Sequence, residues 1–487
     1  MGHISRRQVL ILGGLGTASV VAGGAGLFWS ANAEFVPARA EDLIEPKALR
    51  SVNGTLQVKL TAAEGRTRIA GRSATALTYN RGLPGPTLIL RPGDRVNVSV
   101  ENKMLDPTNL HVHGLHVSPR GNSDNVFVSI DPGSSFDYEY VLPNDHPPGV
   151  YWYHPHHHGM VATQVFGGLY GAIIVEDSIP IPVARERVLV ISDITLDGSG
   201  AIPAASAMDR MIGREGSLML VNGQASPQLK ARPGERERWR VVNACASRYL
   251  KLRLDGQHLQ LLGIDSGRFP QPQDVTEVTL APGNRADLLV TAANGTATLR
   301  SLPVDRGTAI GMMSGVVASS TPENLATFTV AGVPATPLAA VPPQPSPRDL
   351  RTSPINGRRE LIFEMGMGSG GMGMGSGTNM MRFTIDGKEF DPARIDTAVH
   401  AGAVEEWTLT NTSPMDHPIH LHVWPMQIVE QNGALVDRVL WQDVVNVPAH
   451  SSIRVRIPFE DFTGETVYHC HILDHEDGGM MGTITAN

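Results

Sequence analysis

The chain has 487 residues, of which 41% are hydrophobic and 18% charged, so we expect a folded protein of two to four domains, not a disordered one. A formal net charge of −8, with no basic run after the N-terminus, excludes nucleic acid as a partner, because phosphate binding needs a concentrated basic surface. The two cysteines cannot form a disulfide framework, and the 51 glycines and 35 prolines favour a loop-rich, all-β fold.

The N-terminal segment, residues 1–33, has the pattern of an export signal. Ser5–Arg6–Arg7 precedes an apolar stretch from Val9 to Trp29, and Ala31–Asn32–Ala33 offers small residues for cleavage. Adjacent arginines before a mild apolar core are typical of a twin-arginine signal. We therefore expect an exported protein, periplasmic or otherwise outside the cytoplasm. An uncleaved membrane anchor is the alternative interpretation, because the apolar run is long enough to span a bilayer.

One turn-and-strand pattern occurs three times in the rest of the chain. It runs from Arg91 to Asn102, from Arg232 to Asn243 and from His400 to Asn411, each time as a turn followed by alternating residues. Further turns flank each copy in the same order, which indicates repeated domains. The repeats predict three tandem β-sandwich domains at residues 45–178, 183–333 and 356–487, with a proline-rich linker at 334–355.

Paired histidines are the most informative feature of the sequence. Two groups fall in the first predicted domain, His111–Val112–His113 and His154–Pro155–His156, and two in the third, from His417 to His422 and from His469 to His475. A single pair of histidines separated by one residue is weak evidence for a metal site, because on a strand it only places two side chains on one face. Four such groups, none of them in the middle domain, indicate metal binding.

The last group has the ligand set of a blue-copper site. A thiolate, two imidazoles and a distant thioether bind copper in electron-transfer proteins, and Cys470, His475, Met480 and His417 supply these groups. A structural zinc site would need closed four-coordination and would not explain the neighbouring histidines. If Cys470 points to one side of its strand, His469 and His471 point to the other, toward a second metal centre a few bonds away.

Eight histidines remain for that second centre. They fit three copper ions with two, three and three imidazoles, and they come in equal numbers from the first and third domains. The cluster must therefore lie between these domains. The eight are His111, His113, His154, His156, His420, His422, His469 and His471.

These residues resemble the four signature motifs of the multicopper oxidases, and the resemblance covers essentially the whole chain after the signal. It implies three cupredoxin-like Greek-key domains and four copper ions that couple one-electron oxidation of a substrate to the reduction of dioxygen to water. It also implies two acids for proton delivery, Glu476 and Asp124. By the same resemblance type 1 copper is held by His417, Cys470, His475 and Met480, type 2 by His111 and His420, one type 3 copper by His113, His154 and His471, and the other by His156, His422 and His469.

A methionine-rich stretch bears on the substrate. Residues 365–381 alternate methionine with glycine, which a packed core does not do, and thioethers select Cu(I). We therefore expect a cuprous oxidase of copper tolerance, although Ser413 stands where similar cuprous oxidases carry an aspartate. The possible ligands of substrate copper are Met365, Met367, Met372, Met374, Met380, Met381 and Met415.

The sequence leaves several interpretations of the function open. Fe(II) or electron-rich phenols are further donors that an axial methionine favours, which would make the protein a general laccase. A binding protein that sequesters copper, with little turnover, is the alternative to an enzyme. For the methionine stretch itself, the alternative to copper binding is an inert insert. The expected partners are dioxygen and a small reducing substrate, and we expect a monomer.

Overall fold

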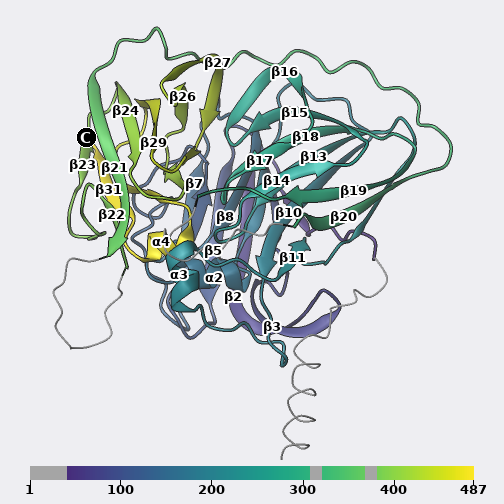
Figure 1. Ribbon diagram of the computed structural model, residues 1–487, viewed down its shortest axis with the longest axis horizontal. Coiled ribbons are helices and arrows are strands. Elements are labelled where there is room, and N and C mark those ends of the chain that lie inside the picture. Colours follow the sequence, from purple (N-terminus) through teal and green to yellow (C-terminus); the bar gives the residue numbers. More distant parts are fainter. Residues whose placement is uncertain (1–40, 308–320, 368–380) are drawn as a thin grey trace, which may run out of the picture. The chain divides into compact units, whose positions relative to one another are not determined.

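The computed structural model describes residues 41–307, 321–367 and 381–487, and the predicted signal segment 1–33 lies outside them. Within the described residues the chain forms six sheets, which pack in pairs as three β-sandwiches (Figure 1). The prediction of an all-β fold with three sandwich domains is confirmed. The described part of the chain contains no helix that is long and apolar enough to cross a membrane.

The first sandwich consists of a five-stranded and a four-stranded sheet. The five-stranded sheet has the order β1-β4-β9-β8-β6, with β1 (Ala48–Arg50), β4 (Thr87–Leu90), β9 (Gly171–Val175), β8 (Gly149–His154) and β6 (His111–His113). The four-stranded sheet has the order β3-β2-β5-β7, with β3 (Arg72–Tyr79), β2 (Thr55–Ile69), β5 (Arg95–Asn102) and β7 (Ser135–Val141).

The second sandwich pairs a six-stranded with a five-stranded sheet. The first has the order β11-β10-β13-β18-β15-β16, with β11 (Leu218–Val221), β10 (Arg185–Ile194), β13 (Arg236–Asn243), β18 (Arg285–Thr291), β15 (His258–Ile264) and β16 (Gly267–Val275). The second has the order β12-β20-β19-β14-β17, with β12 (Gln228–Ala231), β20 (Glu323–Val330), β19 (Gly295–Leu302), β14 (Leu250–Leu254) and β17 (Val278–Leu280).

The third sandwich repeats the topology of the second strand for strand. Its six-stranded sheet has the order β22-β21-β24-β29-β26-β27, with β22 (Met381–Ile385), β21 (Gly357–Met367), β24 (Ala403–Asn411), β29 (Ser451–Phe459), β26 (Met426–Gln431) and β27 (Ala434–Gln442). Its five-stranded sheet has the order β23-β31-β30-β25-β28, with β23 (Thr397–Val399), β31 (Met481–Ala486), β30 (Gly464–Cys470), β25 (His417–Leu421) and β28 (Val444–Val447).

The three sequence repeats form the equivalent strands β5, β13 and β24. Each of these strands pairs in parallel with the long strand before it and antiparallel with a later one. Each follows a turn whose glycine has a positive φ, of 84° at Gly93, 76° at Gly234 and 85° at Gly402, a conformation that glycine adopts without strain. The repeat therefore reports one structural unit that occurs three times.

Alternating side chains fill one core in each sandwich and a fourth core between domains. In β5, for example, Val96, Val98 and Val100 are buried while the residues between them are half-buried or exposed. The fourth cluster combines Trp152 and Val161 of the first domain with Val190 and Val242 of the second. The first and second domains are thus joined by continuous apolar packing.

Three short helices bring the domains together near the histidine groups: α2 (Val161–Gly167), α3 (Ala207–Ile212) and α4 (Leu473–Asp477), which lie close together in Figure 1. The Asp477 carboxylate accepts main-chain N–H groups at the start of α2, at 2.8 Å from Gly159 and 2.9 Å from Ala162. Arg214 of the second domain donates to Asp474 of α4 at 2.6 Å. Helix α4 of the third domain therefore contacts both other domains.

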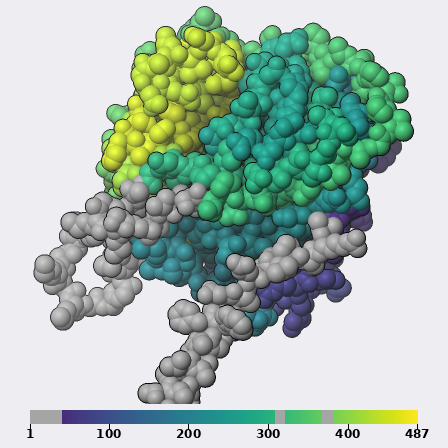
Figure 2. All heavy atoms as spheres, turned by 45° about the vertical axis from the view of Figure 1, so that its right-hand side comes forward, coloured from purple at the N-terminus to yellow at the C-terminus, as the bar shows by residue number. Residues whose placement is uncertain are grey.

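Buried charges form a further contact between the end of the first domain, at Asp177, and the second domain. Arg238 donates to Asp287 at 2.8 and 2.6 Å and to Asp177 at 2.6 Å, and Arg268 pairs with both carboxylates. Cys245 is buried and free, and burial raises the pKa of its thiol, so it is an inert core residue. Figure 2 shows the yellow surface of the third domain directly beside the teal and green surface of the second.

Candidate metal centres

Strand pairing places the histidines of each domain side by side. In the first domain β6 runs antiparallel to β8, so that His111 is opposite His154. In the third domain β25 runs antiparallel to β30, so that His420 is opposite His469 and Ile419 is opposite Cys470. Because side chains alternate along a strand, neighbouring residues of β30 point to opposite faces. One face of the sheet that contains β25 and β30, the face toward the core of the domain, therefore carries the cysteine site, and the other carries imidazoles.

The cysteine site holds three of the four predicted ligands in mutual contact. The Sγ atom of Cys470 lies 3.4 Å from Nδ1 of His417 and 3.9 Å from Nδ1 of His475. All three side chains are completely buried. Met480 is buried in the same core. Its main chain binds two of these ligands, because its N–H donates to the carbonyl of His475 and its carbonyl accepts from the N–H of Cys470. The predicted cysteine, two histidines and methionine thus occupy one loop and one strand end.

The outer edges of the two imidazoles in this site are covered by protein. Nε2 of His417 is 3.0 Å from the Ser413 hydroxyl, and Nε2 of His475 is 3.0 Å from the main-chain oxygen of Met211 in α3. The ring of Phe383 stacks on His475 with centroids 4.4 Å apart. A carbonyl oxygen can only accept, so His475 carries its proton on Nε2 and presents the lone pair of Nδ1 to the site.

The eight remaining histidines meet at the boundary of the first and third domains. Nε2 of His469 lies 3.1 Å from Nε2 of His156 and 3.2 Å from Nε2 of His422. Nε2 of His154 lies 3.4 Å from Nδ1 of His113. Candidate ligand atoms lie within 4.8 Å of one another in three imidazole triads: His111 with His113 and His154, His111 with His420 and His422, and His156 with His422 and His469.

The unpartnered nitrogens show that the cluster suits metal ions. His111 binds Asp124 through Nδ1 at 3.0 Å, and His420 donates from Nδ1 to the main-chain oxygen of Asp443 at 2.7 Å. The Nε2 atoms of both rings are buried without a hydrogen-bond partner among the described residues, as are both ring nitrogens of His471. Buried polar atoms are normally satisfied, so these orphaned, converging lone pairs fit soft to borderline cations such as copper.

Burial keeps these imidazoles neutral. It lowers the pKa of His111, His113 and His420 well below the usual value, and the neighbouring imidazoles lower it further. It lowers the pKa of His156 and His469 to about 4. Neutral imidazole is the form that binds metal, so the site is prepared for cations at physiological pH. Burial raises the pKa of the Cys470 thiol, and a bound cation reverses this by stabilising the thiolate.

The two predicted proton-delivery acids lie against the imidazole cluster. Glu476 is completely buried, with its carboxylate 3.0 Å from Nδ1 of His469 and 3.4 Å from Nε2 of His156. Asp124 holds His111 and also accepts the Val112 N–H at 3.1 Å. Burial raises the pKa of Glu476 to about 7 and that of Asp124 to about 8, in the range where a carboxylic acid can release a proton near neutral pH.

Two residues in contact with the cluster were not predicted. Asp443 directly follows β27, and its carboxylate lies 3.0 Å from Nε2 of His113. Arg285 of the middle domain binds the same carboxylate at 2.5 and 2.7 Å. The sequence offers one signal in the later turn of each repeat, which contains Gly133, Gly283 or Ala449. The second residue after it is Arg285 in the middle repeat but Ser135 and Ser451 in the other two.

The predicted methionine ligands are only partly placed. Met365 and Met381 pair with their neighbours in the β21–β22 hairpin and pack against the core of the third domain, and Met367 lies at the end of β21. The Met365 N–H donates to the Ser413 hydroxyl at 3.1 Å, and Met415 is buried beside His417 in the chain. Met372, Met374 and Met380 lie outside the described residues.

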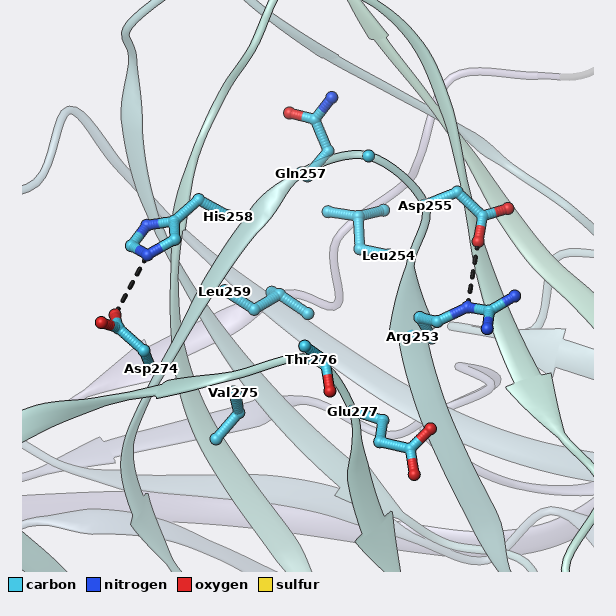
Figure 3. A pocket seen from close by; sticks show the side chains of 11 residues that line it. Arg253, Leu254, Asp255, Gln257, His258, Leu259, Asp274, Val275, Thr276 and Glu277 are labelled. Carbon is cyan, nitrogen blue, oxygen red and sulfur yellow. Dashed lines mark hydrogen bonds and ion pairs between the residues drawn. The ribbon is translucent and has the colours of Figure 1, made fainter.

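A surface pocket of about 910 Å³ lies elsewhere, on the second domain, between the β14–β15 turn and the segment before β17 (Figure 3). Its side chains pair among themselves, His258 with Asp274 at 3.0 Å and Arg253 with Asp255 at 3.2 Å. None of its lining residues belongs to the histidine groups described above.

Comparison with known proteins identifies the family. Three family models, each described as multicopper oxidase, match residues 61–179, 186–299 and 370–487. A solved multicopper oxidase from Campylobacter jejuni, described as a metallo-oxidase, is 31% identical, with a TM-score of 0.80 over 92% of this chain and 96% of that one. The multicopper oxidase mco of Staphylococcus haemolyticus is 27% identical over 89% of both chains, and the cell division protein FtsP of Sodalis glossinidius is 29% identical over 85% of both.

Proposed function

The chain belongs to the multicopper oxidase family of copper-dependent oxidoreductases, which use dioxygen and a reducing substrate, and we propose that its reducing substrate is Cu(I). We further propose that it binds four copper ions. Copper at these sites would take electrons from the donor one at a time and deliver them to dioxygen, which is reduced to water.

The geometry supports a specific assignment of ligands to each proposed ion. The blue-copper site takes Cys470 with the Nδ1 atoms of His417 and His475, and Met480 as the axial residue. The unpartnered Nε2 atoms of His111 and His420 suit the type 2 ion. The remaining imidazoles would form two groups. In the first, the ring of His471 lies 5.0 Å from that of His113 and 5.7 Å from that of His154; the second consists of His156, His422 and His469.

The chain at the end of β30 connects the two proposed centres, and two acids beside the imidazole cluster would supply protons. Cys470 is flanked by His469 and His471, so the main chain links the thiolate to both proposed type 3 ions. Reduction of dioxygen also consumes protons. Glu476, whose carboxylate lies 3.0 Å from Nδ1 of His469, and Asp124, on the other side at His111, would hold and pass those protons.

The observation that carries the choice of Cu(I) is the position of the β21–β22 hairpin, which bears the methionine-rich stretch. Its first strand binds Ser413 through the Met365 N–H, and Ser413 binds His417. Its second strand contributes Phe383, which stacks on His475. The base of the hairpin therefore contacts both imidazoles of the blue-copper site. A thioether-bound Cu(I) carried by this hairpin would be near the point where electrons enter. The Campylobacter jejuni protein is described as a metallo-oxidase, which agrees with a metal-ion substrate.

Oxidation of phenols is the second candidate function. The cover over His475 by the Met211 carbonyl argues against it, since a bulky organic donor would have to displace α3 to reach that ring edge. A role without turnover, which the name of the cell division relative allows for that protein, is disfavoured here. Every predicted imidazole ligand is buried, and its ring lies against the ring of another. We also propose export by the segment 1–33, a role in copper tolerance and a monomeric state.

The test measures oxygen uptake by the copper-loaded protein with Cu(I), given as a weak complex, or with a phenolic donor. In one variant Met372, Met374 and Met380 are replaced by leucine, which keeps the length of the stretch, and Met104→Leu in the core of the first domain is the control. We expect Cu(I) to be the better donor and the triple variant to lose that preference while its phenol oxidation is unchanged. Preference for the phenol in wild type and variant alike would make the protein a laccase.

A further inference from the structure

Asp443 contacts ligands from two domains at once. Its carboxylate lies 3.0 Å from Nε2 of His113, in the first domain, and its main-chain oxygen lies 2.7 Å from Nδ1 of His420, in the third. The two imidazoles stack, with centroids 3.8 Å apart and planes 8° from parallel. One residue thus sits at the outer edges of two stacked rings that belong to different proposed copper ions.

These contacts decide which nitrogen of each ring faces the metal. A carboxylate and a carbonyl oxygen can only accept hydrogen bonds, so His113 carries its proton on Nε2 and His420 carries its proton on Nδ1. The lone pairs then lie on Nδ1 of His113, which faces His154, and on Nε2 of His420, which is otherwise unpartnered. Partners of this kind fix the tautomer and orientation of metal-bound imidazoles in other metalloproteins.

The Asp443 carboxylate is held by the middle domain, which offers no predicted ligand. Arg285 is fully buried and binds both carboxylate oxygens, at 2.5 and 2.7 Å. Its Nη1 also lies 3.1 Å from Asp265, and its Nε donates to the carbonyl of Val150 at 2.9 Å. Paired, bidentate geometry of this sort offsets the cost of burying charge and fixes the carboxylate in one orientation.

The turn before Arg285 reaches the same cluster. Gly283 has a φ of 86°, and a Cβ atom at this position would lie 2.8 Å from Nε2 of His471. Asn284 donates to the carbonyl of Val444 at 3.0 Å, next to Asp443. The segment 283–285 therefore packs against the imidazole cluster with no room for a larger residue at Gly283.

We propose that Asp443, held by Arg285, is the positioning residue that sets the tautomers of His113 and His420, so that the middle domain completes a copper cluster to which it gives no ligand. The inference rests on the copper assignment proposed above. Asp443 acts as an outer partner and not as a ligand, because both carboxylate oxygens are already bound by Arg285 and one of them by His113.

The test uses Asp443→Asn and Arg285→Lys in the full chain. Asparagine keeps the size of the side chain but loses the charge that binds Arg285, and lysine keeps the charge but loses the two-pronged geometry. Either change frees residue 443 to move, together with its main-chain oxygen at His420. Loss of such an outer partner lowers metal affinity by about 10- to 100-fold in other metal sites. We expect that loss for the type 2 and type 3 copper ions alone, measured as copper retained per chain during titration with a chelator and as the type 2 signal in electron paramagnetic resonance. The blue Cu(II)–thiolate absorption band should remain.

Arg238→Lys is the matched control, because Arg238 is equally buried and also binds a carboxylate with two nitrogens, in Asp287. It should keep the type 2 and type 3 copper ions. Retention of these ions by Asp443→Asn and Arg285→Lys, or equal loss in Arg238→Lys, would overturn the inference. A wild-type protein that shows the blue band but no type 2 signal would overturn the copper assignment itself, and the inference with it.

Discussion

Removal of the Ser413 hydroxyl should weaken both the protein and its blue-copper site. The Ser413 Oγ atom accepts the Met365 N–H at 3.1 Å and lies 3.0 Å from Nε2 of His417. Ser413 is buried, with 1% of its surface exposed, so water does not replace the lost oxygen in Ser413→Ala. A buried donor left without its partner costs about 1–3 kcal/mol. Because Met365 is only partly buried, we expect the free energy of unfolding to fall by about 2–4 kcal/mol for the two donors together.

The same substitution separates the methionine hairpin from His417, which gives a functional readout. The band position of the Cu(II)–thiolate absorption should shift, since the proton on Nε2 of His417 loses its acceptor. The KM for Cu(I) should rise more than the KM for a phenolic donor, because only the first depends on the hairpin.

Chemical denaturation, absorption spectroscopy and oxygen-uptake kinetics measure these effects. Ser451→Ala is the control, because among the described residues the Ser451 hydroxyl has one side-chain hydrogen bond, which it donates to the carbonyl of Pro448. Its loss should cost less than about 1.5 kcal/mol and leave the spectrum unchanged. A Ser413→Ala variant with wild-type stability and an unshifted band would refute the reasoning.

Three further outcomes are expected. Cys470→Ser should abolish both the blue absorption and turnover, and a colourless variant that reduces dioxygen at the normal rate would contradict the proposed function. Glu476→Gln should slow oxygen uptake while copper content and the blue band stay unchanged, and wild-type rates would exclude Glu476 from proton delivery. Burial raises the pKa of Asp287, but Arg238 and its neighbouring arginines outweigh it and hold the pKa well below the usual range. Asp287→Asn should therefore lower the free energy of unfolding by about 3–5 kcal/mol at neutral pH. In denaturation curves the difference should shrink as pH falls below about 4, where unfolded aspartate takes up a proton; a constant difference would contradict it.

The histidine groups could be predicted because strand geometry has a simple period. Two histidines separated by one residue share a face of a strand, and the structure shows that β6 and β8 pair so that His111 is opposite His154. The same alternation separates Cys470 from His469 and His471. The three sandwiches could be predicted from the repeated turn and strand, since each copy forms the equivalent strand of its domain. The assignment of each imidazole to an ion came from the family resemblance and not from spacing.

The covering of the blue-copper site could not be predicted from sequence. The group against Nε2 of His475 is the main-chain oxygen of Met211, and every residue type carries such an oxygen. The stacking of Phe383 on His475 joins strand β22 to helix α4, nearly a hundred residues apart, and a single phenylalanine in a strand is more often an ordinary core residue. These contacts depend on how α3 and β22 pack, which is a property of the folded chain.

The contribution of the middle domain was missed for a related reason. A search of the sequence for histidine and cysteine pairs finds metal ligands. The middle domain has none of these pairs, so the sequence gives it no role at the metal centres. Yet a cluster built from two domains places its imidazoles at a boundary, where the groups that orient the rings must come from whatever packs there. Arg285 and Asp443 are 158 positions apart and meet only through the packing of the second domain on the third. Ligand identity is therefore local in the sequence, whereas ligand orientation is a property of the domain assembly.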